Sequence, residues 1–284
     1  MKSFIVIQRK SAMGDVLWIE PVIREASKRY RRVYVVTPFT DLFLNYPIKN
    51  VYFLKELPQP FKILREISKA LFNSVGFIDL GGVYERSPKV NLLRAYLDFV
   101  NFKEANLSYP KLYPTSINHE IKTVVIHIDA PSLSKNFRSV NGVEWPIIRE
   151  FLESRGYSVI GITDNPDTKK YYSETYFSTI ENLISMIASC SLFIGLDSGP
   201  SHIAASLGIP SLIFFGAVDP KLRHIPELFN GEFLQGDCNY LGCYHDYLDN
   251  ESRICRVVGA SDPAPCCKFT TNGVIEAIKR VKSL

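Results

Sequence analysis

LFIGLDSGPSHIAASLGIP, residues 192–210, is the stretch that decides the fold. Its first five residues are apolar and too few for a helix, so they predict a buried strand. From Ile203 onward the apolar residues recur with helical spacing, so a helix follows a short polar turn. In that turn Asp197 and Ser198 can cap the helix, and Gly199 lets the backbone approach a ligand closely. The unpaired N–H groups of the first helical turn then point outward, which makes this turn a candidate anion site.

A second apolar run, residues 211–216, follows after Gly208 and Pro210 end the helix. A strand, a helix and a strand in this order form the unit that joins two parallel strands. Ligands of such sheets bind at the edge formed by the carboxyl ends of the strands. The turn is predicted to lie at that edge, which supports its interpretation as a binding site.

Length and composition predict two domains with full cores, because the chain has 284 residues and 46% of them are hydrophobic. The formal net charge of +4 argues against a dedicated nucleic-acid binder and permits weak attraction to anionic lipid or phosphate. The amino end has too few consecutive apolar residues for a signal peptide, and no apolar run in the sequence is long enough to span a bilayer. We therefore expect a cytoplasmic protein, with peripheral contact with the inner membrane surface as an option.

Short apolar runs alternate with amphipathic segments in the first part of the chain, a pattern typical of an α/β domain with a parallel sheet. A lapse into prolines and scattered polar residues between residues 101 and 120 predicts a linker. The expected strands are residues 4–8, 33–36, 51–53 and 75–80, and the expected helices are residues 16–29, 41–45, 61–72 and 90–100.

A second alternating series predicts another sheet of the same kind. The expected architecture is α/β, with two tandem Rossmann-like, doubly wound domains at residues 1–115 and 120–271 that face each other across a ligand-binding cleft. Residues 272–284 form a last helix that is free to pack back on the first domain. The other expected strands are residues 123–128, 157–162, 192–196 and 211–216, and the other expected helices are residues 146–155 and 179–188.

Two motifs carry a family resemblance. SAMGDVL at residues 11–17 precedes Pro21 and Val22, and DSGPSHIAA at residues 197–205 precedes LGIP at 207–210 and FGAVDP at 215–220. Together they resemble glycosyltransferase family 9, the bacterial heptosyltransferases. The motifs lie about 180 residues apart in the family's order, so the resemblance covers both halves of the chain and is more specific than either motif alone. It implies the GT-B type of fold, with the acceptor on the first domain and a nucleoside-diphosphate sugar on the second.

Asp15 has two compatible interpretations. It can cap a helix that begins at Val16. The resemblance places it at the family's catalytic base, which takes the proton of an acceptor hydroxyl as that oxygen attacks the anomeric carbon. In the same resemblance Ser11, Met13 and Gly14 form the acceptor-side loop.

The turn after residue 196 corresponds in this resemblance to the donor site. The departing diphosphate gains negative charge as its bond to the sugar breaks, and helix-end N–H groups with a histidine donor stabilise that charge. The alternative is an ordinary strand–helix connection with solvated serines. The donor-binding residues predicted here are Asp197, Ser198, Gly199, Pro200 and His202.

A cation for the diphosphate is expected after strand 123–128. The family carries a lysine shortly before a Trp-Pro pair, but here the position two before Trp145 is Val143. Counting forward from the strand favours Lys135 and leaves Arg138 as the other candidate, and a solvated surface lysine is the alternative.

Two more positions are assigned to the donor. Asp164, after strand 157–162, can accept hydrogen bonds from ribose hydroxyls or belong to a turn before Pro166. Gly216 precedes Asp219 and Pro220 in a loop that closes over the donor or forms a simple turn.

Five of the six cysteines lie between residues 238 and 267. Cytosolic thiols stay reduced, so a metal site is more plausible than disulfides, and Cys238, Cys243, Cys255 and Cys266 can form a structural tetrathiolate. Some protein-glycosylating relatives hold iron with such a set, and the family's cysteine before the last helix favours Cys266 over Cys267. Spacing does not separate iron from zinc, and reduced buried thiols without a metal are the alternative.

The predicted function is inverting transfer of a heptose or related sugar from a nucleoside-diphosphate sugar to a hydroxyl of a glycan, lipopolysaccharide core or protein. This scheme requires no catalytic metal. One alternative is a sugar-nucleotide epimerase or hydrolase of the same fold. The other is a non-catalytic, metal-stabilised binding protein.

Overall fold

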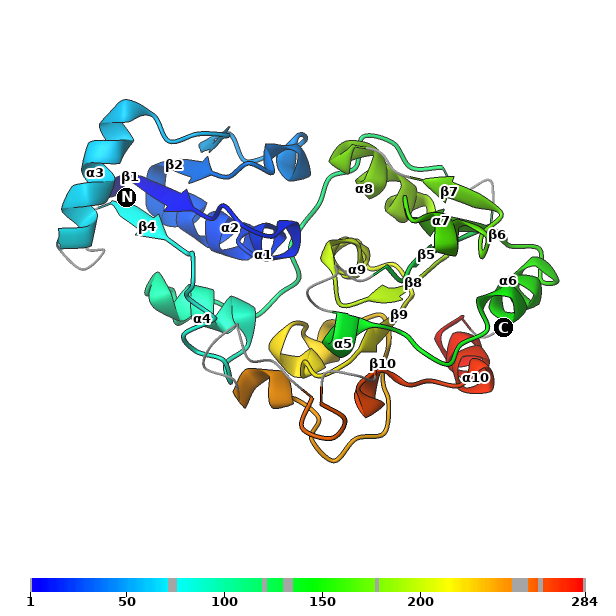
Figure 1. Ribbon diagram of the computed structural model, residues 1–284. Helices are drawn as coiled ribbons and strands as arrows, with labels where there is room; N and C mark the ends of the chain where they lie inside the picture. The colour runs from blue at the N-terminus through cyan, green and yellow to red at the C-terminus, as the bar shows by residue number, and fades with distance from the viewer. Residues whose placement is uncertain are drawn as a thin grey trace. The chain divides into compact units, whose positions relative to one another are not determined.

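The chain forms two compact units, Met1–Thr115 and Ser116–Leu284, each built on one parallel sheet (Figure 1). The predicted α/β class with parallel sheets is therefore confirmed. This computed structural model describes residues 2–70, 76–118, 122–129, 135–176, 179–246, 255–259 and 263–282. Within these ranges no helix combines the length and the apolarity that crossing a membrane requires.

The first unit has a four-stranded sheet in the order β3-β2-β1-β4, and every strand pair in it is parallel. The strands are β1 (Lys2–Gln8), β2 (Tyr30–Val36), β3 (Val51–Leu54) and β4 (Phe77–Asp79). The helices are α1 (Met13–Leu17), α2 (Glu20–Arg29), α3 (Gln59–Ala70) and α4 (Leu92–Phe99), with a 3₁₀ turn, η1, at Thr40–Phe43.

One predicted helix is in fact two. The apolar spacing from Val16 predicted a single helix, whereas α1 ends at Leu17 and α2 begins at Glu20 with Pro21 in its first turn. Proline has no N–H to donate to the preceding turn, and its fixed φ suits the start of a helix.

The second unit has a six-stranded sheet in the order β10-β9-β8-β5-β6-β7, again all parallel. The strands are β5 (Thr123–His127), β6 (Ser158–Ile162), β7 (Glu174–Tyr176), β8 (Leu192–Leu196), β9 (Ser211–Phe215) and β10 (Gly231–Gln235). The main helices are α5 (Lys135–Arg138), α6 (Trp145–Glu153), α7 (Pro166–Lys169), α8 (Ile180–Ser189), α9 (Gly199–Ser206) and α10 (Thr271–Lys282). Short 3₁₀ turns are η3 (Pro220–Leu222), η4 (Pro226–Leu228), η5 (Cys243–Asp246) and η6 (Pro265–Cys267).

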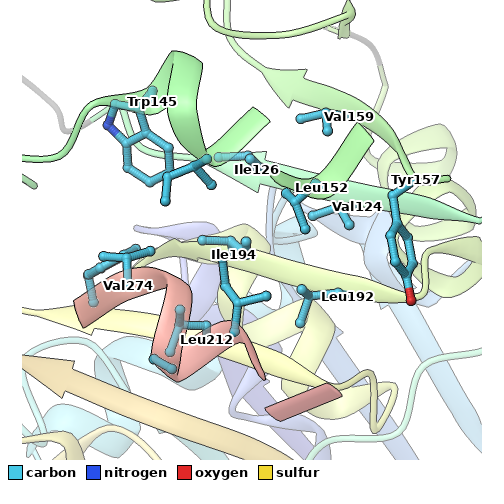
Figure 2. Packing of buried hydrophobic residues seen from close by; sticks show 14 of the residues in the cluster. Val124, Ile126, Trp145, Leu152, Tyr157, Val159, Leu192, Ile194, Leu212 and Val274 are labelled. Carbon is cyan, nitrogen blue, oxygen red and sulfur yellow. The ribbon is translucent and has the colours of Figure 1, made fainter. Parts of the chain in front are cut away.

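The core of the second unit explains why its central strands read as unbroken apolar runs. All five residues of β8 and all five of β9 are buried, as expected where helices cover both faces of a parallel sheet. Figure 2 shows one of these faces, where Ile194 and Leu212 of the sheet belong to one buried cluster with Trp145 of α6 and Val274 of α10. The helix α10 thus packs on α6, β9 and β10 of its own unit. That residues 272–284 also reach the first domain stays a prediction.

Each sheet has one place where its winding reverses. In the first unit β1 has β2 on one side and β4 on the other, and in the second unit β5 has β6 on one side and β8 on the other. The loops that leave the carboxyl ends of such a strand pair diverge to opposite faces, and ligands of doubly wound sheets bind there. The loop with Asp15 follows β1, and the loop with Ser198 follows β8.

A fully buried carboxylate ties α2 to two loops of the first unit. Glu20 accepts hydrogen bonds from Arg24 at 3.1 and 3.2 Å, from the Tyr46 hydroxyl at 2.9 Å and from the Lys111 backbone N–H at 3.0 Å. A buried charge is tolerated when its partners are all in place, and removing one side leaves the others unpaired.

We predict that Glu20→Ala lowers the free energy of unfolding of the first unit by about 3–5 kcal/mol. Trp18 is buried in this unit, so its fluorescence during urea unfolding, measured in a Trp145→Phe background, reports this unit alone. The matched control is Glu25→Ala, which removes a solvent-facing pair with Lys28 and should cost less than about 1 kcal/mol. Equal losses of unfolding free energy in the two variants would contradict the view that the buried Glu20 carboxylate stabilises this unit.

Candidate functional site

The turn between β8 and α9 has the geometry of a capped helix start. Ser198 is the N-cap of α9, and its backbone N–H donates to the Ser201 hydroxyl at 3.0 Å. The Ser198 hydroxyl donates to the Leu196 carbonyl and lies 3.1 Å from Nδ1 of His127. Because His127 is the last residue of β5, this contact spans the place where the winding of the sheet reverses.

The other predicted residues of this turn take different places. Gly199 and Ser198 are half-buried, whereas Pro200, Ser201 and His202 are buried in the first turn of α9. Capping by Asp197 was expected as an option, but the N-cap of α9 is Ser198, and Asp197 is the buried residue between the end of β8 and this cap.

Asp197 is the centre of a buried charge cluster. Its Oδ1 lies 3.5 Å from Nε2 of His202, and its Oδ2 lies 3.6 Å from a guanidinium nitrogen of Arg138. Burial raises the pKa of Asp197, but the positive charges of Arg138, His202 and Arg223 outweigh that effect, so the pKa lies below its ordinary value. The carboxylate is therefore ionised at neutral pH and holds the Arg138 guanidinium and the His202 imidazole at the carboxyl edge of the sheet.

The same cluster can be tested as a metal site. Ligand atoms of Asp197, His202 and His224 all lie within 4.8 Å of one another, a spacing that one ion can bridge. However, the guanidinium of Arg138 and the charge of Arg223 act on the same carboxylate, and like charges disfavour a divalent cation. Burial, with His202 and Arg223 adding to it, lowers the pKa of His224 well below its usual value. The imidazole of His224 is therefore neutral, which is the form that ligates a metal, so the feature that opposes a cation at this cluster is the charge of the two arginines.

The end of β5 carries a second polar group. Asp129 accepts hydrogen bonds from the hydroxyls of Thr163 and Thr168, whose chain positions follow β6. Asp164, the predicted ribose ligand, is exposed, and Asn165 beside it caps α7. Asp129 is therefore the carboxylate that this edge holds in place, and the prediction for Asp164 stays untested.

The helix α5 brings the candidate cations to this edge. Lys135 and Arg138 are its first and last residues; the side chain of Lys135 lies outside the described residues, and that of Arg138 reaches Asp197. A Cβ at Gly216 would lie 1.9 Å from the Phe137 carbonyl oxygen, so a glycine is needed for α5 to approach the end of β9. Gly216 thus has a packing role that its assignment to the donor did not foresee.

The cysteine-rich segment packs directly beneath α5. Cys243, Cys255, Cys266 and Cys267 are buried together with Phe137 and Ala217, and Cys238 packs against them. All six cysteines are free thiols in the structure. Among the described residues, the group spaced for a common metal ion is the Asp197 cluster and not these thiols.

In the first unit, Asp15 lies inside α1 and not at its cap. The cap is Ala12, whose φ of 58° is in the left-handed region that favours glycine. Met13 and Gly14 are half-buried, and Ser11 is exposed. Strained backbone of this kind often accompanies functional loops.

The carboxylate of Asp15 is held from one side. A guanidinium nitrogen of Arg9 lies 2.5 Å from Oδ2, and the Tyr84 hydroxyl donates to the same oxygen at 3.1 Å. Arg9 follows the last residue of β1 and Tyr84 lies in the loop after β4, so this group forms where the winding of the first sheet reverses.

Sequence reasoning missed several residues of both groups. The signal that could have found Arg9, His127 and Asp129 is their position directly at or after the end of a buried strand. Tyr84 and Arg223 carry no such signal, because only the fold brings their loops to the site.

The fold is that of the GT-B glycosyltransferases. TibC, the iron-containing dodecameric glycosyltransferase from enterotoxigenic E. coli, superposes with a TM-score of 0.75 at 16% identity, covering 100% of this chain and 80% of that chain. Its complex with ADP-D-beta-D-heptose gives the same TM-score at 17% identity, with coverage of 100% and 79%.

The sequence itself gives the family resemblance. Residues 178–226 match the family described as glycosyltransferase family 9 (heptosyltransferase). Lipopolysaccharide heptosyltransferase 3 of Escherichia coli is 25% identical over 41% of this chain, and the match spans 40% of that relative's length. The resemblance inferred from the motifs is thereby confirmed, and the matched residues include the whole turn from Asp197 to His202.

The ring of His127 makes the second unit sensitive to acid. Burial lowers its pKa from 6.5 to about 4, with Asp129 opposing the shift. Between these two pH values the unfolded chain binds a proton that the folded chain does not, so stability falls as the pH falls. We predict that His127→Gln reduces this loss by up to about 1.4 kcal/mol per pH unit, measured by urea unfolding from pH 6.5 to 4. An unchanged slope would show that this histidine is protonated in the folded state.

Proposed function

We propose that the protein is an inverting glycosyltransferase that transfers a heptose or related sugar from a nucleoside-diphosphate sugar to a hydroxyl acceptor. The observation that carries this proposal is the turn from Asp197 to His202. It lies at the winding reversal of the second sheet, starts a capped helix beside Arg138 and falls inside the segment that matches glycosyltransferase family 9.

The chemistry of the leaving group fits this turn. Diphosphate oxygens gain negative charge as the sugar leaves, and the Gly199 backbone N–H at the start of α9 is the donor proposed to meet it, because Pro200 has no N–H and the capping box with Ser198 uses the Ser201 N–H. Arg138 adds a full positive charge, and its ion pair with the buried Asp197 keeps that charge in place. Lys135, one helical turn earlier on α5, is the second proposed cation.

The remaining donor assignments are kept as part of the proposal. Ser198, Gly199 and Pro200 form the wall of the turn, His202 donates to the diphosphate, and Asp164 contacts the ribose. Gly216 is kept as a donor-site residue and also allows α5 to approach the site.

Asp15 is the proposed base. Its carboxylate can take the proton of the acceptor hydroxyl while that oxygen attacks the anomeric carbon and the nucleoside diphosphate departs from the opposite side. Ser11, Met13 and Gly14 would line the acceptor path. The proposal requires that the carboxyl edges of the two units face each other across a cleft during the reaction, with donor and acceptor held in line.

The relatives suggest the substrates. TibC binds ADP-D-beta-D-heptose in its solved complex, so ADP-heptose is the first donor to test. Lipopolysaccharide heptosyltransferase 3 of Escherichia coli acts on lipopolysaccharide by its name, so a lipopolysaccharide core, another glycan and a protein hydroxyl are the acceptors to compare. A cytoplasmic location with peripheral membrane contact would suit a lipid-linked acceptor.

A structural metal is proposed at the cysteine cluster. Cys238, Cys243, Cys255 and Cys266 pack in one group next to α5, and thiolates suit zinc or iron, so binding would require their sulfur atoms to move closer than they lie in the structure. TibC is described as iron-containing. A bound metal would make the segment that packs against α5 more rigid and would in this way support the placement of Arg138.

The decisive experiment separates donor binding from chemistry. We predict that ADP raises the melting temperature of both the wild type and Asp15→Asn, because the donor site lies in the other unit. Sugar transfer from ADP-heptose should fall at least 100-fold in Asp15→Asn, since the amide cannot take a proton. Arg138→Met is the reciprocal control, which should weaken the shift by ADP.

Two outcomes would reject this proposal. Normal turnover by Asp15→Asn would show that Asp15 is not the base. Failure of every nucleoside diphosphate and its sugars to stabilise the wild type would favour a non-catalytic binding protein. Release of nucleotide without an acceptor, or an isomerised sugar, would point to the epimerase or hydrolase alternative.

For the cysteine cluster we predict a metal content of about one equivalent of iron or zinc per chain, measured by elemental analysis. Cys266→Ser should lose the metal and weaken ADP binding, because α5 loses its support. The matched control is Cys190→Ser, a cysteine outside the cluster, which should keep the metal. A metal-free wild type with full ADP affinity would leave the thiols as ordinary core residues.

A further inference from the structure

We propose that Arg9 and Tyr84 are positioning residues that fix one oxygen of Asp15 and leave the other free for the acceptor hydroxyl. This inference rests on the proposed role of Asp15 as the base. Both hydrogen bonds that the structure gives to the Asp15 side chain end on Oδ2. The side chain is 17% exposed, so the carboxylate is sheltered without being closed off.

Arg9 is placed too firmly to be an ordinary surface arginine. Only 1% of the residue is exposed, and its backbone N–H donates to the Val36 carbonyl of the neighbouring strand at 3.1 Å. One terminal guanidinium nitrogen donates to the Leu80 carbonyl at 3.1 Å, while the other reaches Asp15. A buried guanidinium anchored in this way presents its remaining donors in one fixed direction.

Tyr84, in the loop after β4, is the second residue that holds Oδ2 of Asp15. Its hydroxyl donates to Asp15 Oδ2, and the Arg9 guanidinium carbon lies 5.5 Å from the centre of its ring. Two donors from different loops on one oxygen leave the carboxylate little freedom to rotate. Holding the carboxylate in one orientation directs the lone pair of Oδ1 toward the acceptor hydroxyl, which raises the rate of proton transfer.

Glu85 explains how this arrangement tolerates proton transfer. Its Oε1 accepts from the same guanidinium nitrogen of Arg9 at 3.1 Å. When Asp15 takes up a proton and becomes neutral, Arg9 keeps an anionic partner and is not left as an unpaired buried charge. Burial lowers the pKa of Arg9, but Tyr96, Asp15 and Glu85 together raise it above its usual value, so the guanidinium stays charged throughout.

The first unit also contains a tyrosine–carboxylate hydrogen bond that serves only the stability of the fold. Tyr46 donates to the buried carboxylate of Glu20 at 2.9 Å in the same unit, a bond of the same chemistry to a carboxylate that has no proposed part in the reaction. The pair Tyr84→Phe and Tyr46→Phe therefore removes one tyrosine–carboxylate hydrogen bond in each case. Only the first should affect catalysis.

The test compares these two variants, Arg9→Ala and the wild type, in transfer from ADP-heptose. We expect Tyr84→Phe to lower kcat about tenfold with the donor KM unchanged, and Tyr46→Phe to lower only the melting temperature. Arg9→Ala should lose at least 100-fold in kcat and recover about tenfold with added guanidinium, whereas urea, which has a similar shape and no charge, should not rescue it.

The failures are distinguishable. If the wild type transfers sugar and Asp15→Asn does not, but Tyr84→Phe equals Tyr46→Phe and guanidinium has no effect on Arg9→Ala, the positioning role is wrong while the proposed function stands. If Arg9→Ala does not fold, Tyr84→Phe alone decides, because it keeps the ring that faces Arg9. If the wild type transfers no sugar, both proposals fall together.

Discussion

The structure depends on one constraint of parallel sheets, which is that the winding must reverse somewhere if helices are to cover both faces. In the second unit this happens between β5 and β8, and the contact between His127 and Ser198 joins the two strand ends there. At such a reversal the loops diverge, so backbone N–H groups and strand-end side chains gather at the carboxyl edge of the sheet. The features proposed for donor binding all follow from that position.

Both units use a similar electrostatic device for different purposes. An arginine faces a carboxylate at the carboxyl edge in each: Arg138 with Asp197, and Arg9 with Asp15. Asp197 is buried, so its charge serves to fix its neighbours, whereas Asp15 keeps some exposure and one oxygen without such partners. This difference in burial is the reason why Asp197 is proposed to support the donor site and Asp15 is proposed to act as the base.

The packing under α5 links three features that look unrelated in the sequence. Gly216 admits the carbonyl of Phe137, the Ala217 N–H donates to that carbonyl at 3.1 Å, and the Cys267 carbonyl accepts from the backbone of Asn141 beyond α5. The cysteine-rich segment therefore supports the helix that carries the candidate cations. Its distance in sequence from that helix hides this role.

The sequence by itself determined the α/β class, most strands and helices, and the turn at Ser198. These features rest on local signals, namely unbroken apolar runs, helical spacing and capping residues. The short edge strands β7 and β10 were missed because they lack an apolar run. The division of the first predicted helix was missed because apolar spacing continues across Pro21.

Only the tertiary structure decided which side chains meet. The sequence predicted Asp197 as a possible cap and as a donor-site residue, whereas only the tertiary structure shows its carboxylate buried beside Arg138. Asp15 and Arg9 are close in sequence, but Tyr84 joins them only because β4 pairs with β1. The physical reason is that local pattern fixes elements, whereas strand order, a long-range property, determines which loops share an edge.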